Sequence, residues 1–220
     1  MAYELYFVKN ILNWYSENRR IFPWRYTFDP FKVFISEIML QRTRAENVIE
    51  PYKKMLNNFK SVADIEKVNQ NELTRILNTL GLKYRVKRLK NISESFCENY
   101  SCNIPNNQND LLNTSGIGQY ICNAILCFGY GMKYPIFDTN VLRIFERFFG
   151  VKSMTKSPHK DKKMWDFAEK LLPEENYVDY NYSLLDFAAK VCKARNPCCK
   201  ECPLNYYCKY PDKYVNSTKT

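Results

Sequence analysis

Four cysteines near the C-terminus form the most specific chemical pattern in this sequence. Cys192, Cys199, Cys202 and Cys208 have the spacing C-x6-C-x2-C-x5-C, so four thiolates fall within 17 residues. Structural zinc sites usually draw their ligands from two close pairs, whereas here only Cys199 and Cys202 are close. Wide arms suit a [4Fe–4S] cube, in which each iron takes one cysteine. The spacing therefore favours an iron–sulfur cluster over zinc, with Cys198 as a neighbour that could compete as a ligand.

A second pattern combines a glycine turn with an aspartate. Gly116 and Gly118 stand between two helical patterns, and such glycines permit a tight turn whose backbone N–H groups meet phosphate at a helix N-terminus. An ordinary helix–helix turn has the same residues. Asp138 follows Tyr120 by 18 residues, at the start of another helix. An N-cap is the simplest role for this carboxylate.

The composition predicts a globular protein with an anionic partner. The 220 residues are 45% hydrophobic and 15% aromatic, which excludes a disordered chain. The net charge of +10 indicates a polyanionic partner such as nucleic acid, and a solvated basic surface without such a partner is the alternative. No apolar run approaches the ~18 residues of a membrane span, and the first residues lack a basic signal-peptide segment. We therefore expect an intracellular protein that does not enter membranes.

The remaining cysteines predict no disulfide framework. The total of nine is odd, which favours metal binding or free thiols in a reducing compartment. Outside the C-terminal pattern, we expect Cys97, Cys102, Cys122 and Cys127 to pack as small apolar residues.

The elements that must position these residues are helices. The first is predicted by apolar residues at helical spacing, namely Val8, Ile11, Leu12 and Tyr15. Asp29 and Pro30 predict the N-cap and first residue of a long helix that carries Glu37 among apolar neighbours. Further helices are expected over 64–67, over 70–80 with Gly81 as C-cap, over 85–100 and after Pro105. No strand alternation is sustained, so the predicted class is all-α.

Taken in order, these motifs resemble the helix-hairpin-helix DNA glycosylase superfamily. The nearest branch contains endonuclease III, the adenine glycosylase MutY and the thymine mismatch glycosylase Mig, and Mig is the most similar. Three more stretches carry the resemblance: Phe22-Pro-Trp-Arg25, Val33 to Thr43, and Gly81 to Arg85, which is similar to the loop that enters the minor groove. The match covers about residues 10–212.

The resemblance implies two helical lobes with a DNA cleft between them. One lobe would span 24–131 and hold the helix-hairpin-helix motif. The other would combine 1–23 with 132–212 and hold the [4Fe–4S] cluster, with 213–220 as a tail. Asp138 would then lie at the junction of the lobes.

The resemblance also assigns catalytic roles. Asp138 would stabilise the positive charge on the sugar and direct water. Glu37 would contact the base or the water, and its apolar neighbours should raise its pKa. Bifunctional relatives have a lysine at position 120, whose amine forms a Schiff base. Tyr120 cannot do so, which implies a monofunctional enzyme and matches Mig, whereas MutY has serine there.

The same resemblance implies the DNA contacts. Gln41 and Arg42 would fill the gap left by a flipped base or contact the orphan guanine, although the MutY-like pattern has glutamine rather than Arg42. The other implied contacts are Leu82, Lys83, Tyr84 and Arg85 in the minor-groove loop, and Gly116, Gly118 and Gln119 in the hairpin.

We therefore expect a monomeric enzyme that removes thymine and uracil opposite guanine in double-stranded DNA. A MutY-like adenine glycosylase is the alternative, because Tyr84 matches the tyrosine that MutY places beside 8-oxoguanine. MutY carries a separate C-terminal domain, whereas this sequence continues about twelve residues past Cys208, which together with Tyr120 favours the Mig-like expectation. A second alternative is a non-catalytic iron–sulfur module that binds DNA.

Overall fold

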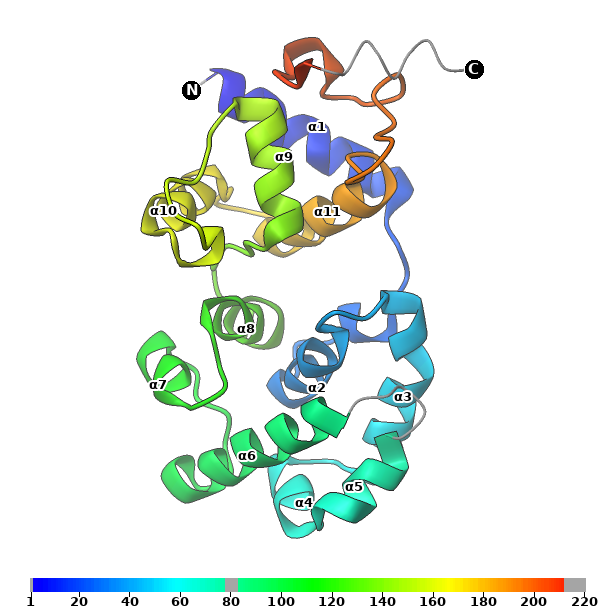
Figure 1. Ribbon diagram of the computed structural model, residues 1–220, viewed down its shortest axis with the longest axis vertical. Helices are drawn as coiled ribbons and strands as arrows, with labels where there is room; N and C mark the ends of the chain where they lie inside the picture. The colour runs from blue at the N-terminus through cyan, green and yellow to red at the C-terminus, as the bar shows by residue number, and fades with distance from the viewer. Residues whose placement is uncertain (1, 78–82, 212–220) are drawn as a thin grey trace. The chain divides into compact units, whose positions relative to one another are not determined.

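The computed structural model describes residues 2–77 and 83–211, and within these ranges it contains helices and no strand (Figure 1). The predicted all-α class is confirmed. The described chain forms two compact units. Unit 1 joins the N-terminal residues up to Arg20 with the residues from Lys133 onward, and unit 2 spans Ile21–Met132. The predicted C-cap at Gly81 lies outside the described residues.

Unit 1 is built around aromatic side chains. Its elements are α1 (Ala2–Asn18), α9 (Thr139–Phe149), η4 (Pro158–Lys160), α10 (Lys162–Leu171), α11 (Tyr177–Lys190) and η5 (Asn205–Tyr207). Phe7 of α1 is fully buried, and its ring lies 5.0 Å from that of Phe148 on α9. The deepest residues of α1 are Phe7, Ile11 and Tyr15, because they recur every four residues along one face.

Unit 2 surrounds the apolar helix α2. Its elements are η1 (Pro23–Arg25), α2 (Pro30–Leu40), α3 (Ala45–Asn58), α4 (Val62–Lys67), α5 (Gln70–Leu77), α6 (Lys83–Tyr100), α7 (Gln108–Asn113), α8 (Gln119–Ala124) and the π-helical turn η3 (Ile125–Gly129). Asp29 caps α2 by accepting hydrogen bonds from the backbone of Phe31 and Lys32, as predicted. Figure 1 shows α2 in the middle of the unit, where it contacts α3, α6, α8 and η3.

One glycine sets how closely α2 and η3 approach. A Cβ atom on Gly129 would lie 2.8 Å from the Cα atom of Pro30, a distance that packed atoms do not reach without a backbone shift. Glycine at this position therefore lets the continuous rod of α8 and η3 pack against the first turn of α2. This contact fixes the spacing of the helices that carry Glu37 and Tyr120.

The cysteines outside the C-terminal pattern behave in two ways. Cys122 and Cys127 are buried in unit 2, as predicted, and burial raises the pKa of the Cys122 thiol to about 12. Cys97 and Cys102 instead form a disulfide, which corrects the expectation that they pack as free thiols. The cause is local: Ser101 and Cys102 both have positive φ angles, so the chain turns back at the end of α6 and brings Cys102 beside Cys97.

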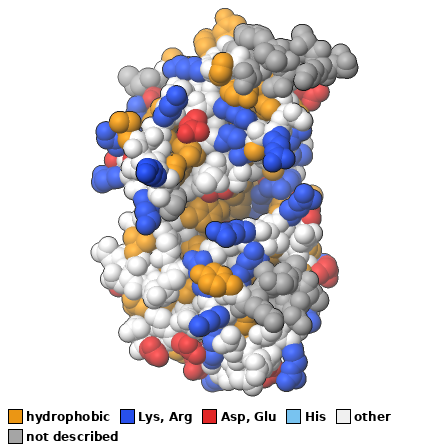
Figure 2. Space-filling view, in the orientation of Figure 1, with side chains coloured by type: hydrophobic (Ala, Val, Ile, Leu, Met, Phe, Trp, Pro, Cys, Tyr) orange, Lys and Arg blue, Asp and Glu red, His pale blue; other side chains and the backbone are white. Residues whose placement is uncertain are grey.

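No helix in the described ranges combines the length and apolar character that a bilayer span requires. The surface is instead rich in basic side chains. Figure 2 shows lysine and arginine over both units on the face displayed, with fewer acidic groups among them. This distribution agrees with the net charge of +10.

Candidate active site

Asp138 is the N-cap of α9 in unit 1. Its Oδ1 accepts hydrogen bonds from the backbone N–H groups of Asn140 and Val141, both at 2.8 Å. Its Oδ2 accepts a third from the Asn140 side chain at 2.7 Å. Capping and a chemical role do not exclude each other, because the cap holds a half-buried carboxylate in one orientation at a helix start.

Hydrogen bonds connect Asp138 to the cysteine-rich segment. Asn140, which donates to Asp138, accepts from Nη1 of Arg143 at 3.1 Å. Nε of Arg143 in turn donates to the carbonyl oxygen of Cys192 at 2.9 Å. No role was predicted from the sequence for Asn140 or Arg143, although their spacing of three residues on one helix was a usable signal.

Glu37 and Tyr120 lie in unit 2, on helices that pack together. Glu37 is on α2 and is only 5% exposed, among buried apolar neighbours. Tyr120 is on the first turn of α8 and is half-buried. Contacts between α2 and α8 hold the two residues on neighbouring elements.

The predicted hairpin is the turn between α7 and α8. Gly116 has φ +95, and the backbone N–H of Ile117 donates to the carbonyl oxygen of Thr114 at 3.0 Å. Gly118 is the N-cap of α8 and contributes no side-chain cap. A surface groove runs beside the turn and is lined by Tyr84, Lys87, Arg88, Asn91 and Ser115 to Gly118. The groove thus combines exposed backbone with basic and aromatic side chains.

The two hairpin glycines should respond differently to alanine. Gly116→Ala is expected to destabilise the protein by about 1–2 kcal/mol, because φ is positive and the new Cβ would lie 3.1 Å from Cγ1 of Ile92. Gly118→Ala is the matched control, since no atom lies within 4 Å of its Cβ position. Denaturant unfolding of both variants measures the difference. Equal losses of stability would contradict this account of the turn.

Two arginines of α6 hold the loop that follows α2. Nη1 of Arg85 donates to the carbonyl oxygen of Met39 at 3.1 Å and to Oγ1 of Thr43 at 2.6 Å. Burial, and then the charge of Arg42, lower the pKa of Arg85. Arg42 is exposed and has φ 54, an uncommon conformation for a residue with a Cβ atom. Arg88, the second arginine, reaches both Gln41 and the hairpin.

The other predicted contact residues are placed as follows. Tyr84 stands on the first turn of α6 and is 77% exposed. Gln119 donates from Nε2 to Oδ1 of the buried Asn123 at 2.8 Å, so its side chain bonds within unit 2. Lys83 is the first residue of α6, and Leu82 lies outside the described residues.

The four C-terminal cysteines lie close enough to influence one another. Burial, together with Cys208, Cys192 and Cys199, raises the pKa of Cys202 to about 12, and a backbone hydrogen bond involving Leu204 opposes the shift. The described residues contain no group of three or more ligating side chains already arranged around a metal position. The donor chemistry nevertheless fits a metal centre, because thiols that resist ionisation together are ionised by a bound cation.

Arg147 lies against the same segment. Its Nη1 donates to the Cys192 sulfur at 3.5 Å and to the carbonyl oxygen of Lys193 at 2.7 Å. Its guanidinium stacks over the Tyr210 ring at 4.4 Å. Arg147 was not predicted from the sequence as a site residue. Its cationic side chain offsets the negative charge that thiolates would bring.

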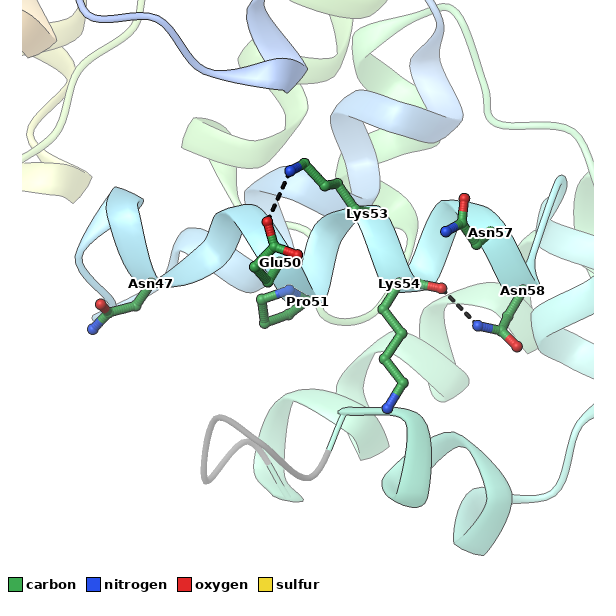
Figure 3. Close-up of a pocket in the computed structure, with 7 residues that line it drawn as sticks. All are labelled: Asn47, Glu50, Pro51, Lys53, Lys54, Asn57 and Asn58. Atoms are coloured by element: carbon green, nitrogen blue, oxygen red, sulfur yellow. Dashed lines mark hydrogen bonds and ion pairs between the residues drawn. The ribbon is translucent and has the colours of Figure 1, made fainter.

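A separate polar hollow lies on α3 (Figure 3). Lys53 pairs with Glu50 at 2.8 Å, and Asn58 donates to the carbonyl oxygen of Lys54 at 2.7 Å. None of the predicted site residues lines this hollow.

A match to a protein-family model shows which family this chain belongs to. The model of the HhH-GPD superfamily of base excision DNA repair proteins matches residues 35–171, more than half of the chain. The chain belongs to the HhH-GPD superfamily. The HhH-GPD match includes Glu37, the hairpin glycines, Tyr120 and Asp138, and it ends before the cysteine segment.

Two curated relatives that match over nearly their whole length are named DNA glycosylases. The chain is 35% identical to a thymine/uracil-DNA glycosylase of Methanothermobacter thermautotrophicus, over 94% of both chains. It is 33% identical to a thymine-DNA glycosylase of Aeropyrum pernix over 92% of both. An adenine DNA glycosylase of Buchnera aphidicola is 30% identical, but only 63% of that protein is covered.

Solved structures confirm the HhH-GPD fold. A thermostable thymine-DNA glycosylase matches with a TM-score of 0.88 and 33% identity, covering 96% of this chain and 98% of that one. A non-covalent endonuclease III–DNA complex matches with a TM-score of 0.80 at 18% identity, which shows a shared fold.

Proposed function

We propose that this protein is a monofunctional DNA glycosylase that removes thymine, and uracil, mispaired with guanine. The observation that carries the proposal is the 35% identity, over 94% of both chains, with a thymine/uracil-DNA glycosylase. The reaction hydrolyses the N-glycosidic bond and leaves an abasic site in base excision repair.

Asp138 is the proposed catalytic carboxylate. In the reaction, the bond between C1′ of the sugar and N1 of the pyrimidine breaks, and the base leaves with the electron pair. Water adds its oxygen to C1′, and its proton passes to the carboxylate and then to the departing base. Positive charge on the sugar is stabilised by the nearby carboxylate, as in glycoside hydrolysis. The two backbone donors at 2.8 Å support this role, because they hold Asp138 ready without reorganisation.

Glu37 and Tyr120 are the proposed catalytic residues of unit 2. Glu37 would contact the flipped base or the water, and its burial supports the role because a carboxylate is rarely placed in apolar surroundings without function. A phenol cannot form an imine with the sugar, so Tyr120 supports hydrolysis without strand cleavage.

The proposed DNA surface is the set of loops around α6. Backbone N–H groups at Gly116 and Gly118 would bind phosphate, and the exposed ring of Tyr84 would enter the minor groove. Gln41 and Arg42 would occupy the gap beside the orphan guanine. Arg85 would act through the loop after α2 that it holds, and Gln119 would contact DNA from the first turn of α8. Leu82 and Lys83 are proposed from the sequence alone.

We propose a [4Fe–4S] cluster at Cys192, Cys199, Cys202 and Cys208. When bound, the cluster would supply four iron–thiolate bonds that cross-link the end of α11 to the C-terminal segment. Arg147 is placed to donate a hydrogen bond to one of these sulfurs. The protein would then act as an intracellular monomer on double-stranded DNA.

A second candidate function is adenine removal opposite guanine or 8-oxoguanine. It is supported by the exposed Tyr84 and by 30% identity with an adenine DNA glycosylase. A DNA-binding module without catalysis is the remaining alternative, and one experiment separates the three.

The test is a panel of labelled duplexes that contain G:T, G:U, A:8-oxoguanine or A:T pairs. We expect strand breaks at G:T and G:U only after alkali, because the enzyme itself leaves the backbone intact. Breaks at A:8-oxoguanine would favour the adenine candidate, and breaks without alkali would contradict a monofunctional enzyme. Binding to duplexes without any base release would favour the non-catalytic module.

A further inference from the structure

Arg88 connects two loops that lie far apart in the sequence, the loop after α2 and the hairpin between α7 and α8. Its Nη1 donates to Oε1 of Gln41 in the loop after α2. Its Nε donates to the carbonyl oxygen of Gly116 in the hairpin at 3.0 Å, and Nη2 donates to the same oxygen. Gln41 and Gly116 lie 47 and 28 residues from Arg88 in sequence, so this bridge depends on tertiary packing.

The bond from Arg88 determines whether the amide oxygen or the amide nitrogen of Gln41 faces away from the guanidinium. A guanidinium is only a donor, so the group of Gln41 that faces it must be the oxygen. The amide nitrogen, with its two hydrogens, then lies on the other side of the Gln41 amide group. Gln41 is half-buried, and its amide N–H groups lie on the side away from Arg88.

The surroundings hold this arrangement in place. Arg85 bonds to Met39 and Thr43, on either side of Gln41 in the chain. The Arg88 stem packs beside Gly116, whose Cβ position lies 3.8 Å from Cγ of Arg88. Rotating the Gln41 amide would break the bond to Arg88 and leave two hydrogen-bond donors facing a guanidinium.

We propose that Arg88 is a positioning residue for specificity: it fixes Gln41 as a donor that reads the base opposite the excised pyrimidine. Guanine carries an acceptor, O6, where adenine carries the N6 amino donor. At this position, the N–H groups of Gln41 can donate to O6 of guanine but meet the N6 amino group of adenine donor to donor. The usual glutamine–adenine pairing presents the amide oxygen and nitrogen to the base together, whereas Arg88 holds that oxygen toward its own guanidinium. Gln41 would thus help to protect thymine in normal A:T pairs.

This inference rests on the proposed glycosylase function, so the test uses substrates that separate the two. Single-turnover release of uracil is measured opposite guanine, opposite adenine and opposite a baseless tetrahydrofuran residue. Arg88→Ala is expected to lower the ratio of the G:U rate to the A:U rate by about tenfold. Relative to the rate opposite tetrahydrofuran, where no base remains to be read, the G:U rate should fall and the A:U rate should rise.

Two further variants make the test specific. Gln41→Glu keeps a partner for Arg88 but removes both donors, so it should lower the same ratio even if Arg88→Ala folds poorly. Lys87→Ala is the charge-matched control from the same groove and should lower all three rates by one common factor. An unchanged G:U to A:U ratio in Arg88→Ala and Gln41→Glu would overturn the inference, as would equal losses on all three substrates. Absence of uracil release by the wild-type protein would instead refute the proposed function.

Discussion

Asp138→Asn is expected to reduce base release by about a thousandfold or more while DNA binding is retained. The carboxylate is proposed to stabilise the positive charge on the sugar, and a neutral amide cannot replace that charge. Asparagine is as good an N-cap as aspartate, so its side-chain oxygen can still accept from the backbone of Asn140 and Val141. The measurement is single-turnover release from a G:T duplex, with binding followed by fluorescence anisotropy.

Asp138→Ala separates charge from capping. Alanine removes both, so this variant should lose activity and also about 1 kcal/mol of stability. Asp161→Asn is a control at another N-cap of unit 1, where the side chain accepts from the backbone of Met154 and Lys163. That variant should release base normally. A rate for Asp138→Asn within a few-fold of wild type would exclude the proposed role of the carboxylate.

Local signals in the sequence account for much of the fold. Asp29 followed by Pro30 predicts a helix start from chemistry within four residues, and α2 begins at Pro30. The helical start after Asp138 is equally local, because an N-cap needs only its own first turn. Family resemblance, rather than periodicity, distinguished this aspartate from an ordinary cap.

The unpredicted features depend on residues that meet only after folding. The bridge from Arg88 to Gln41 and Gly116 requires α6 to pack against two other loops, and nothing in its basic neighbourhood distinguishes Arg88 from Lys87. The disulfide at Cys102 requires positive φ angles at two consecutive non-glycine residues. Such a conformation has no sequence signature comparable to a glycine C-cap.

The cysteine segment offers the sharpest paired comparison in the chain, because Cys198 and Cys199 are adjacent and only one belongs to the proposed ligand set. Cys199→Ser is expected to abolish the broad visible absorbance of thiolate-ligated iron. The substitution removes a cross-link over about 17 residues. It should therefore lower the free energy of unfolding by about 3 kcal/mol and Tm by about 10 °C. Iron and sulfide analysis, absorbance spectra and thermal unfolding measure these effects.

Cys198→Ser should retain iron and stability. The backbone N–H of Cys198 donates to the carbonyl oxygen of Val191 at 2.9 Å, and this bond, which orders the turn after α11, does not use the sulfur. Loss of iron from Cys198→Ser but not from Cys199→Ser would show that Cys198, and not Cys199, is the ligand. A colourless wild-type protein that contains zinc would show that zinc, and not a [4Fe–4S] cluster, binds the four cysteines. The position of Arg147 beside Cys192 fits either metal, because both centres carry negatively charged thiolates; the comparison therefore rests on metal content and colour.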